Sequence, residues 1–110
     1  TKVEANRQAR QIQIMQALGK NIQTLDEKVI DQHSWQVLWQ NRNSVAMRKV
    51  VMGVLVKDPK GNVRRYVAHV DGDVRPGQRF AATFRMEDLT VAQLKQMQIR
   101  YYLDDAQPYR

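Results

Sequence analysis

The stretch RFAATFRM, residues 79–86, alternates apolar and polar or small side chains along its whole length. Phe80 and Phe84 fall on one face of the alternation, and Arg79 and Arg85 fall on the other. Because side chains of a β-strand point to opposite faces with a period of two, this stretch predicts a strand with one buried and one solvated face. Such half-covered strands are typical of antiparallel sheets.

The same two-residue period, or a run rich in valine, continues on both sides of this strand. Further strands are expected over residues 34–41, 47–57, 63–70 and 99–103. The segment Asp58–Asn62, DPKGN, predicts a hairpin turn, because proline presets the first turn dihedral and glycine accepts a positive φ. Residues 89–96 favour one or two helical turns with Thr90 as the N-cap.

The beginning of the chain has a different pattern. Residues 5–30 predict a helix, because Ala, Gln, Arg, Leu, Met and Lys dominate and no proline intervenes. Apolar residues recur there at alternating steps of three and four, as in a coiled-coil seam. The members of this candidate helix interface are Met15, Leu18, Ile22, Leu25 and Val29. The seam suits either docking on the chain's own sheet or contact with another subunit.

These patterns predict a mainly β fold, an antiparallel sandwich-like domain of five to six strands with one N-terminal α-helix. A length of 110 residues with 43% apolar side chains suits one domain with a modest core. Within it we expect the helix over residues 1–31, the β module over 32–105 and a tail over 106–110. The expected core contains Trp35, Val37, Trp39, Val54, Phe80, Phe84, Ile99 and Leu103.

The net charge of +7 is concentrated in the middle of the chain. Residues 42–85 hold ten basic and three acidic side chains, whereas the flanking segments are close to neutral. This excess predicts a basic face that is either solvated or faces an anionic partner, which could be an acidic protein or anionic membrane lipid, with nucleic acid as the alternative. The aromatic residues fall in the apolar phase of their strands, which favours a place in the core over base stacking. The candidate surface residues are Arg48, Lys49, Arg64, Arg65, Arg75, Arg79 and Arg85.

Residues suited to catalysis or metal binding are few. The chain has no cysteine and only two histidines, His33 and His69. His69 with Asp71 and Asp73 is the best available acid-base group, but its spacing matches no metal or acid-base motif, and acids around a glycine are ordinary turn formers. We therefore predict no catalytic residue, no metal site and no cofactor, and we expect a protein that is not an enzyme.

Turn and strand signals between Val37 and Met86 resemble small immunoglobulin-like modules of the FxLYD type, which are common in bacterial envelope proteins. The resemblance rests on the following segments: Asn41 to Ser44, Val50 to Val56, Asp58 to Asn62, and Pro76-Gly77 before Phe80 and Phe84. It covers about half the chain, and the family's Tyr-Asp pair is Lys57-Asp58 here. The order of helix then strands is also similar to periplasmic domains of secretion components, in which a long N-terminal helix packs on a curved antiparallel sheet.

Both resemblances imply a non-enzymatic interaction or assembly module of a bacterial envelope or secretion-type complex. They also imply a periplasmic or envelope-associated location, although a cysteine-free chain suits the cytoplasm equally. A protein partner or self-association is the leading expectation, and nucleic acid bound by the basic 42–85 surface is the alternative. The sequence has no apolar run of the roughly 20 residues that a membrane-spanning helix needs.

Overall fold

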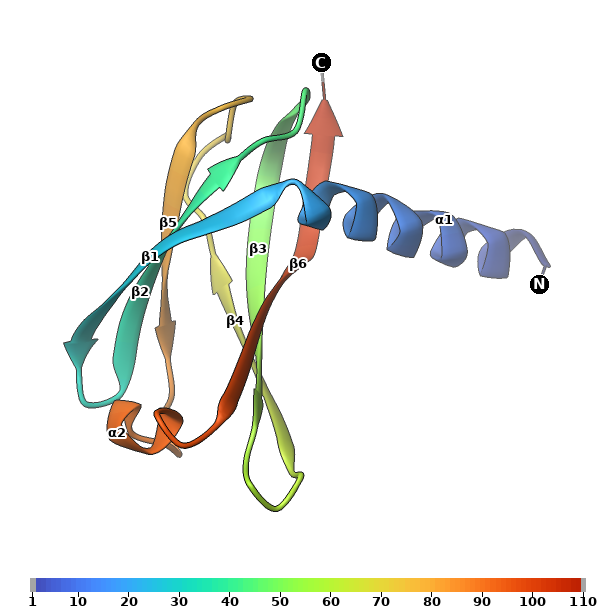
Figure 1. Cartoon of the computed structure of the whole chain (residues 1–110). Coiled ribbons are helices and arrows are strands. Elements are labelled where there is room, and N and C mark those ends of the chain that lie inside the picture. The colour runs from blue at the N-terminus through green and yellow to red at the C-terminus, as the bar shows by residue number, and fades with distance from the viewer. Residues whose placement is uncertain (1, 110) are drawn as a thin grey trace.

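Two three-stranded antiparallel sheets face each other in the computed structural model, which describes residues 2–109 (Figure 1). The expected mainly β, sandwich-like fold with one N-terminal helix is confirmed, with six strands. The first sheet has the order β1 (Ile22–Asp31), β2 (Ser34–Asn41) and β5 (Arg79–Arg85). The second has the order β4 (Val63–His69), β3 (Ala46–Lys57) and β6 (Gln98–Tyr109). Helix α1 (Lys2–Lys20) precedes the sandwich, and α2 (Val91–Leu94) lies between β5 and β6.

The core lies between the two inner faces and is dominated by aromatic rings. Trp35 of β2 lies 5.2 Å from Phe84 of β5, and Trp39 lies 5.5 Å from Phe80, measured between ring centroids. Tyr101 of β6 stacks on Phe84 at 5.9 Å, which joins the second sheet to this cluster. Offset and edge-on ring pairs of this kind add to the stabilisation from apolar burial. The alternation of residues 79–86 therefore predicted the buried face correctly.

The local signals around the turns are also confirmed. Asp58 and Asn62 close the β3–β4 hairpin through the hydrogen bond from the Asp58 N–H to the Asn62 carbonyl, at 2.9 Å. Gly61 in this turn has φ of 91°, a conformation that glycine adopts without strain. Thr90 caps α2, since its hydroxyl accepts from the Gln93 N–H while the Gln93 side chain accepts from the Thr90 N–H.

The helix expected over residues 1–31 is too long, because α1 ends at Lys20 and residues 22–31 form strand β1. The register of β1 against β2 shifts between Thr24 and Asp26, which marks a bulge around Leu25. A bulge inserts an extra residue into one strand. As a result Ile22 and Leu25, the two half-buried residues of β1, are three residues apart. That spacing imitates the period of a helix.

The prediction of a tail over residues 106–110 is wrong for residues 106–109. Strand β6 continues to Tyr109 and pairs there with the beginning of β3. A register shift near Asp105 interrupts the alternation, so that Leu103 and Ala106 are both buried. Ile99 is the one expected core residue that fails, with 37% of its surface exposed. It lies toward one open side of the sandwich, where the other sheet does not cover it.

Candidate interaction surface

The side chains considered for catalysis have structural partners or lie apart. The His33 ring nitrogen Nδ1 lies 2.8 Å from the Leu89 carbonyl, which ties the β1–β2 turn to the segment before α2. Asp73 accepts a 2.6 Å hydrogen bond from the Tyr109 hydroxyl, whereas His69 is exposed on β4. Asp31 accepts from the His33 backbone N–H, and this hydrogen bond lowers the pKa of Asp31. Within residues 2–109, no three acidic or histidine side chains are grouped so that they could hold a metal ion.

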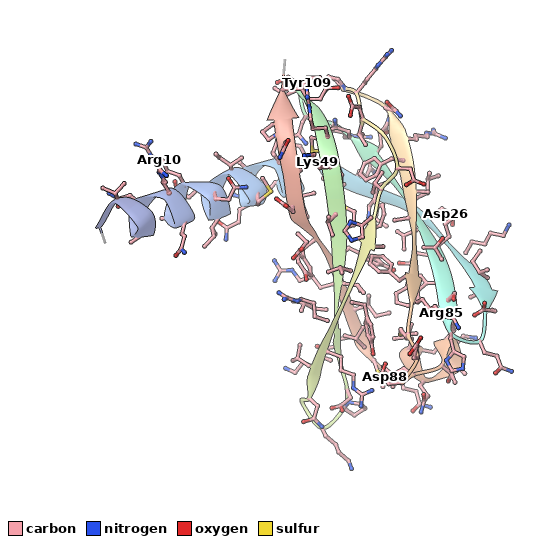
Figure 2. All side chains as sticks on the ribbon, turned by 180° about the vertical axis from the view of Figure 1, so that it is seen from behind. Arg10, Asp26, Lys49, Arg85, Asp88 and Tyr109 are labelled. Atoms are coloured by element: carbon pink, nitrogen blue, oxygen red, sulfur yellow. The ribbon has the colours of Figure 1, made fainter. Side chains whose placement is uncertain are left out.

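The seven basic residues of the expected anionic-partner surface are distributed over different faces. The alternation of β5 places Arg79 and Arg85 on the outer face of the first sheet, whereas Arg65 lies opposite Leu55 on the outer face of the second. Figure 2 shows Lys49 toward the end of the sandwich that holds Tyr109, and Arg85 toward the end that holds Asp88. The structure therefore does not bring the seven together as one patch.

Two of the arginines are held by contacts within the chain. The Arg64 guanidinium lies 2.6 Å from the Asp88 carboxylate, which also accepts a 2.7 Å hydrogen bond from the Tyr66 hydroxyl. This hydroxyl, together with the charge of Arg64, lowers the pKa of Asp88. The Arg48 guanidinium lies 4.0 Å from the centre of the Tyr109 ring, in cation–π geometry. Arg75 lies in the β4–β5 connection, beyond both sheets.

The last turn of α1 is fixed to the sandwich. Leu18 is buried with 8% of its surface exposed, and its carbonyl accepts a 3.0 Å hydrogen bond from the Asn43 side-chain amide. Asn43 is itself buried, and its amide also donates to the side-chain oxygen of Asn41 at 2.9 Å. A Cβ on Gly19 would meet the Leu103 Cβ at 3.6 Å, so the helix approaches β6 closely there. The anchored end sets the direction in which α1 leaves the sandwich.

The remainder of α1 projects away from the sheets as a free arm (Figure 1). Every described side chain between Val3 and Ile14 is exposed, and Val3, Ile12 and Ile14 expose 62%, 58% and 43% of their surfaces. Nineteen helical residues extend roughly 28 Å. Isolated helices shorter than about 12–15 residues are only marginally stable in water, and most helices in proteins are stabilised by packing of one face. The exposed part of α1, residues 3–14, is in this range. The arm therefore leaves apolar residues uncovered on two sides, Val3 and Ile14 on one and Ile12 on the other.

A groove of about 820 Å³ lies between the arm and β6. Ile12, Met15 and Gly19 line it from the helix, and Tyr102 and Leu55 line it from the outer face of the second sheet. Its polar lining residues include Arg100, Asp104 and Asp105 of β6. Among the described residues, the Tyr102 hydroxyl has no hydrogen-bond partner although the oxygen is buried, and burial raises the pKa of Tyr102.

Each sheet has two edge strands: within residues 2–109, β1 and β5 pair only with β2, whereas β4 and β6 pair only with β3. The edges of β1 and β6 lie on the same side of the sandwich. Between them, beside α2, lies a cleft of about 400 Å³. Its apolar lining residues are Val29, Trp35, Val91, Leu94, Met97 and Ile99. Free edges of long strands are templates for pairing with another chain.

The expected helix interface is split between two elements. Met15 and Leu18 lie on α1, where Met15 lines the groove and Leu18 is part of the core, whereas Ile22, Leu25 and Val29 lie on β1. Val29 exposes 58% of its surface in the cleft. The sequence pattern missed Ile12, the most exposed apolar residue of the groove, because Ile12 falls outside the seam that starts at Met15.

No protein-family model, curated protein or solved structure matches the chain in the comparisons. No helix within residues 2–109 combines the length and the apolar character that a membrane span requires.

Proposed function

We propose that this protein is a non-enzymatic assembly module that self-associates or docks through α1 and the free strand edges. The observation that carries the proposal is the arm, an α-helix anchored at one end whose side chains from Val3 to Ile14 are exposed where described. A helix whose end is held by the buried Asn43 contact keeps its exposed apolar residues in fixed positions. The apolar groove beside it and the open edge of β1 supply further area for a partner.

We place the module in a bacterial envelope or secretion-type complex, at the periplasmic side. The support for this location is the similarity of its turn and strand signals to FxLYD-type modules. Nucleic acid is not our proposed partner. The basic residues that would hold a phosphate backbone lie on separate faces, and the tryptophan and phenylalanine rings that could stack on bases are in the core.

The test is the mass of the protein in solution, measured by light scattering after size exclusion over a range of concentrations. We expect a mass above that of one 12.9 kDa chain, which rises with concentration. This mass should fall when an exposed apolar residue on either surface is replaced by glutamate. The two substitutions are Ile12→Glu on the arm and Val29→Glu on β1. Gln13→Glu is the matched control, because Gln13 is exposed on α1 and the same charge is added next to Ile12. A mass of one chain at every concentration contradicts self-association.

A further inference from the structure

We infer that the free edge of β6 pairs with an antiparallel strand from another protein, in which an acidic residue lies between two apolar residues. The inference rests on the proposed function, because docking through a free strand edge is one of the contacts proposed above. It names the edge and the chemistry of the partner. The edge runs from Ile99 to Leu103, between α2 and the anchored end of the arm (Figure 1).

The hydrogen bonds at the two ends of the β3–β4 ladder show which way the backbone groups of β3 point. At one end the Val50 carbonyl accepts from the Val70 N–H at 2.9 Å. At the other end the Asp58 N–H donates to the Asn62 carbonyl at 2.9 Å, and the register between the two ends has no shift. Backbone bonds alternate sides along an antiparallel strand. The even-numbered residues of β3 from 50 to 56 therefore bond toward β4, and the odd-numbered residues bond toward β6.

Ile99 and Tyr101 consequently present their backbone groups to the free side of β6. The register sets Arg100 opposite Leu55, so Arg100 bonds to β3. Its neighbours Ile99 and Tyr101 point the other way. Within residues 2–109, no strand other than β3 pairs with β6. Donors and acceptors that repeat every second residue match an extended polypeptide, which adds to a sheet as a further strand.

The same edge connects the groove and the cleft. Tyr101 lines the groove, where Ile12 is exposed, and Ile99 lines the cleft, where Val29 is exposed. Ile99 shares the inner face of the second sheet with the buried Val56 opposite it. The inward side chains of a strand paired with β6 would lie beside Ile99 and face Val29 across the cleft. Large apolar side chains therefore suit the inner face of the added strand.

Arg100 favours an acidic residue on the outer face of the added strand. Arg100 lies between the two edge-pairing residues, opposite Leu55 on the outer face, and is exposed. Opposite charges directly across a strand pair are favourable, whereas like charges are unfavourable. A glutamate or aspartate flanked by apolar residues therefore matches this edge. The net charge of +7 attracts an acidic partner at longer range.

The edge does not suit a second copy of β6. An antiparallel pair of two β6 strands centred on Arg100 sets the two copies of this arginine directly opposite each other. A pair centred one residue later needs the backbone of Leu103, but a Cβ on Gly19 would lie only 3.9 Å from the Leu103 nitrogen. A pair centred one residue earlier needs the Met97 N–H, which already donates to the Leu94 carbonyl at 2.9 Å. The strand therefore comes from a different sequence.

A synthetic peptide tests the backbone pairing directly. The probe is the labelled peptide Ser-Thr-Val-Glu-Val-Thr-Ser, and its binding to the full-length chain is measured by fluorescence anisotropy. In the antiparallel pair the valine N–H groups point to β6 and the glutamate N–H points away. We expect saturable binding below about 1 mM, at least about tenfold weaker with N-methylated valines and changed less than about threefold with N-methylated glutamate.

Protein variants test the same bond from the side of β6. Ile99→Pro removes the N–H on the free side and leaves the bonds between its neighbours and β3, which an edge strand tolerates. We expect it to bind the peptide at least about tenfold more weakly than Ile99→Ala, the matched control that keeps the N–H. Arg100→Glu should weaken the glutamate peptide and strengthen a peptide with lysine in its place. Circular dichroism checks the fold, and the methylated peptides test the wild-type protein independently of it.

The outcomes separate this inference from the proposed function. Absence of saturable binding up to about 1 mM, or equal binding of the two methylated peptides, overturns the inference. Loss of binding with N-methylated glutamate alone overturns the antiparallel arrangement. A protein that self-associates by light scattering while the peptide does not bind keeps the proposed function and loses this inference. Self-association that Ile99→Pro abolishes and Ile99→Ala preserves would place a second copy on the edge and overturn the choice of partner. A monomeric protein that binds no peptide loses both.

Discussion

Gly53 shows how one residue shapes the surface beside the arm. It lies opposite Tyr102 in the β3–β6 register, and a Cβ built on it would lie 2.2 Å from the Cζ atom of the tyrosine ring. The tyrosine ring therefore covers the backbone of β3 at Gly53. The side chain of any other residue at position 53 would occupy the space that the ring fills. Glycine inside a strand weakens the strand unless a close approach of this kind compensates. Tyr102 in turn forms part of the groove.

We expect Gly53→Ala to destabilise the fold by about 1–2 kcal/mol, because the added methyl displaces the Tyr102 ring. Urea denaturation measures the change in the free energy of unfolding. The control is the same substitution in a Tyr102→Ala background. There the methyl has room, and alanine should be neutral or up to about 1 kcal/mol more stable than glycine in a strand. An equal loss in both backgrounds would show that the ring is not the cause.

The contact between Gly53 and Tyr102 could be predicted only in part from the sequence. A glycine in the valine-rich run 50–56 indicates a close backbone approach, but the residue that approaches lies about fifty positions later. Asn43 is a second example. Its position in the sequence predicts a turn residue, but its buried hydrogen bond to the Leu18 carbonyl depends on the path of α1. Patterns within a short window report the environment of a residue and leave its long-range partner undetermined.

At the scale of elements, the path of α1 depends on its last turn. The Leu18 side chain fills a site in the core, while the Asn43 amide holds the Leu18 carbonyl and the Asn21 N–H reaches the same carbonyl at 3.1 Å. Arg42 N–H then donates to the Asn21 carbonyl at 2.8 Å, which joins the start of β1 to the end of β2. Hydrogen bonds from two segments thus hold the helix end, and the direction of the arm follows from them.

Asn43→Ala should loosen this anchor. The substitution removes the amide bonds to the Leu18 carbonyl and to Asn41, and we expect a loss of about 1–2 kcal/mol in the free energy of unfolding. Hydrogen exchange at the backbone amides of the last turns of α1 should accelerate more than exchange in β3. Asn21→Ala is the control, because the Asn21 amide is exposed and its bond to the Ala17 carbonyl is long, at 3.5 Å. Equal exchange in the two variants would exclude Asn43 as the anchor.

Elements with a regular period could be predicted from the sequence, whereas bulged strands could not. β2, β3, β4 and β5 appear within about one residue of their expected bounds, and each is bordered by turn residues. In β1 the bulge at Leu25 produces helix-like spacing, and in β6 the shift near Asp105 interrupts the alternation. Pairing with β2 and β3 stabilises both strands, so the deciding interaction is long-range. For the same reason only two of the five expected interface residues lie on α1.

At the scale of the whole molecule, folding divides one basic segment among several surfaces. Residues 42–85 run through both sheets, so their basic side chains project from opposite faces and from both ends of the sandwich. Arg65 and Arg79 are an example, since β4 belongs to one sheet and β5 to the other. Charge density along the sequence therefore overestimates charge density on any one face. A partner that needs a continuous basic surface would therefore meet only some of the basic side chains of residues 42–85 on any one face.

This distribution predicts weak, sequence-blind binding to nucleic acid, with a dissociation constant above about 10 micromolar at physiological salt. Each phosphate contact releases counterions, so affinity for a labelled single strand, measured by fluorescence anisotropy, should fall steeply between about 50 and 200 mM salt. Because Arg65 and Arg79 lie on opposite faces, Arg65→Glu and Arg79→Glu should each reduce the residual binding by a similar small factor. A nucleic-acid site on one face would instead respond to one of these substitutions and ignore the other. Tight binding that survives the higher salt and is lost with one of them would identify that face as a nucleic-acid surface, in place of the protein partner proposed above.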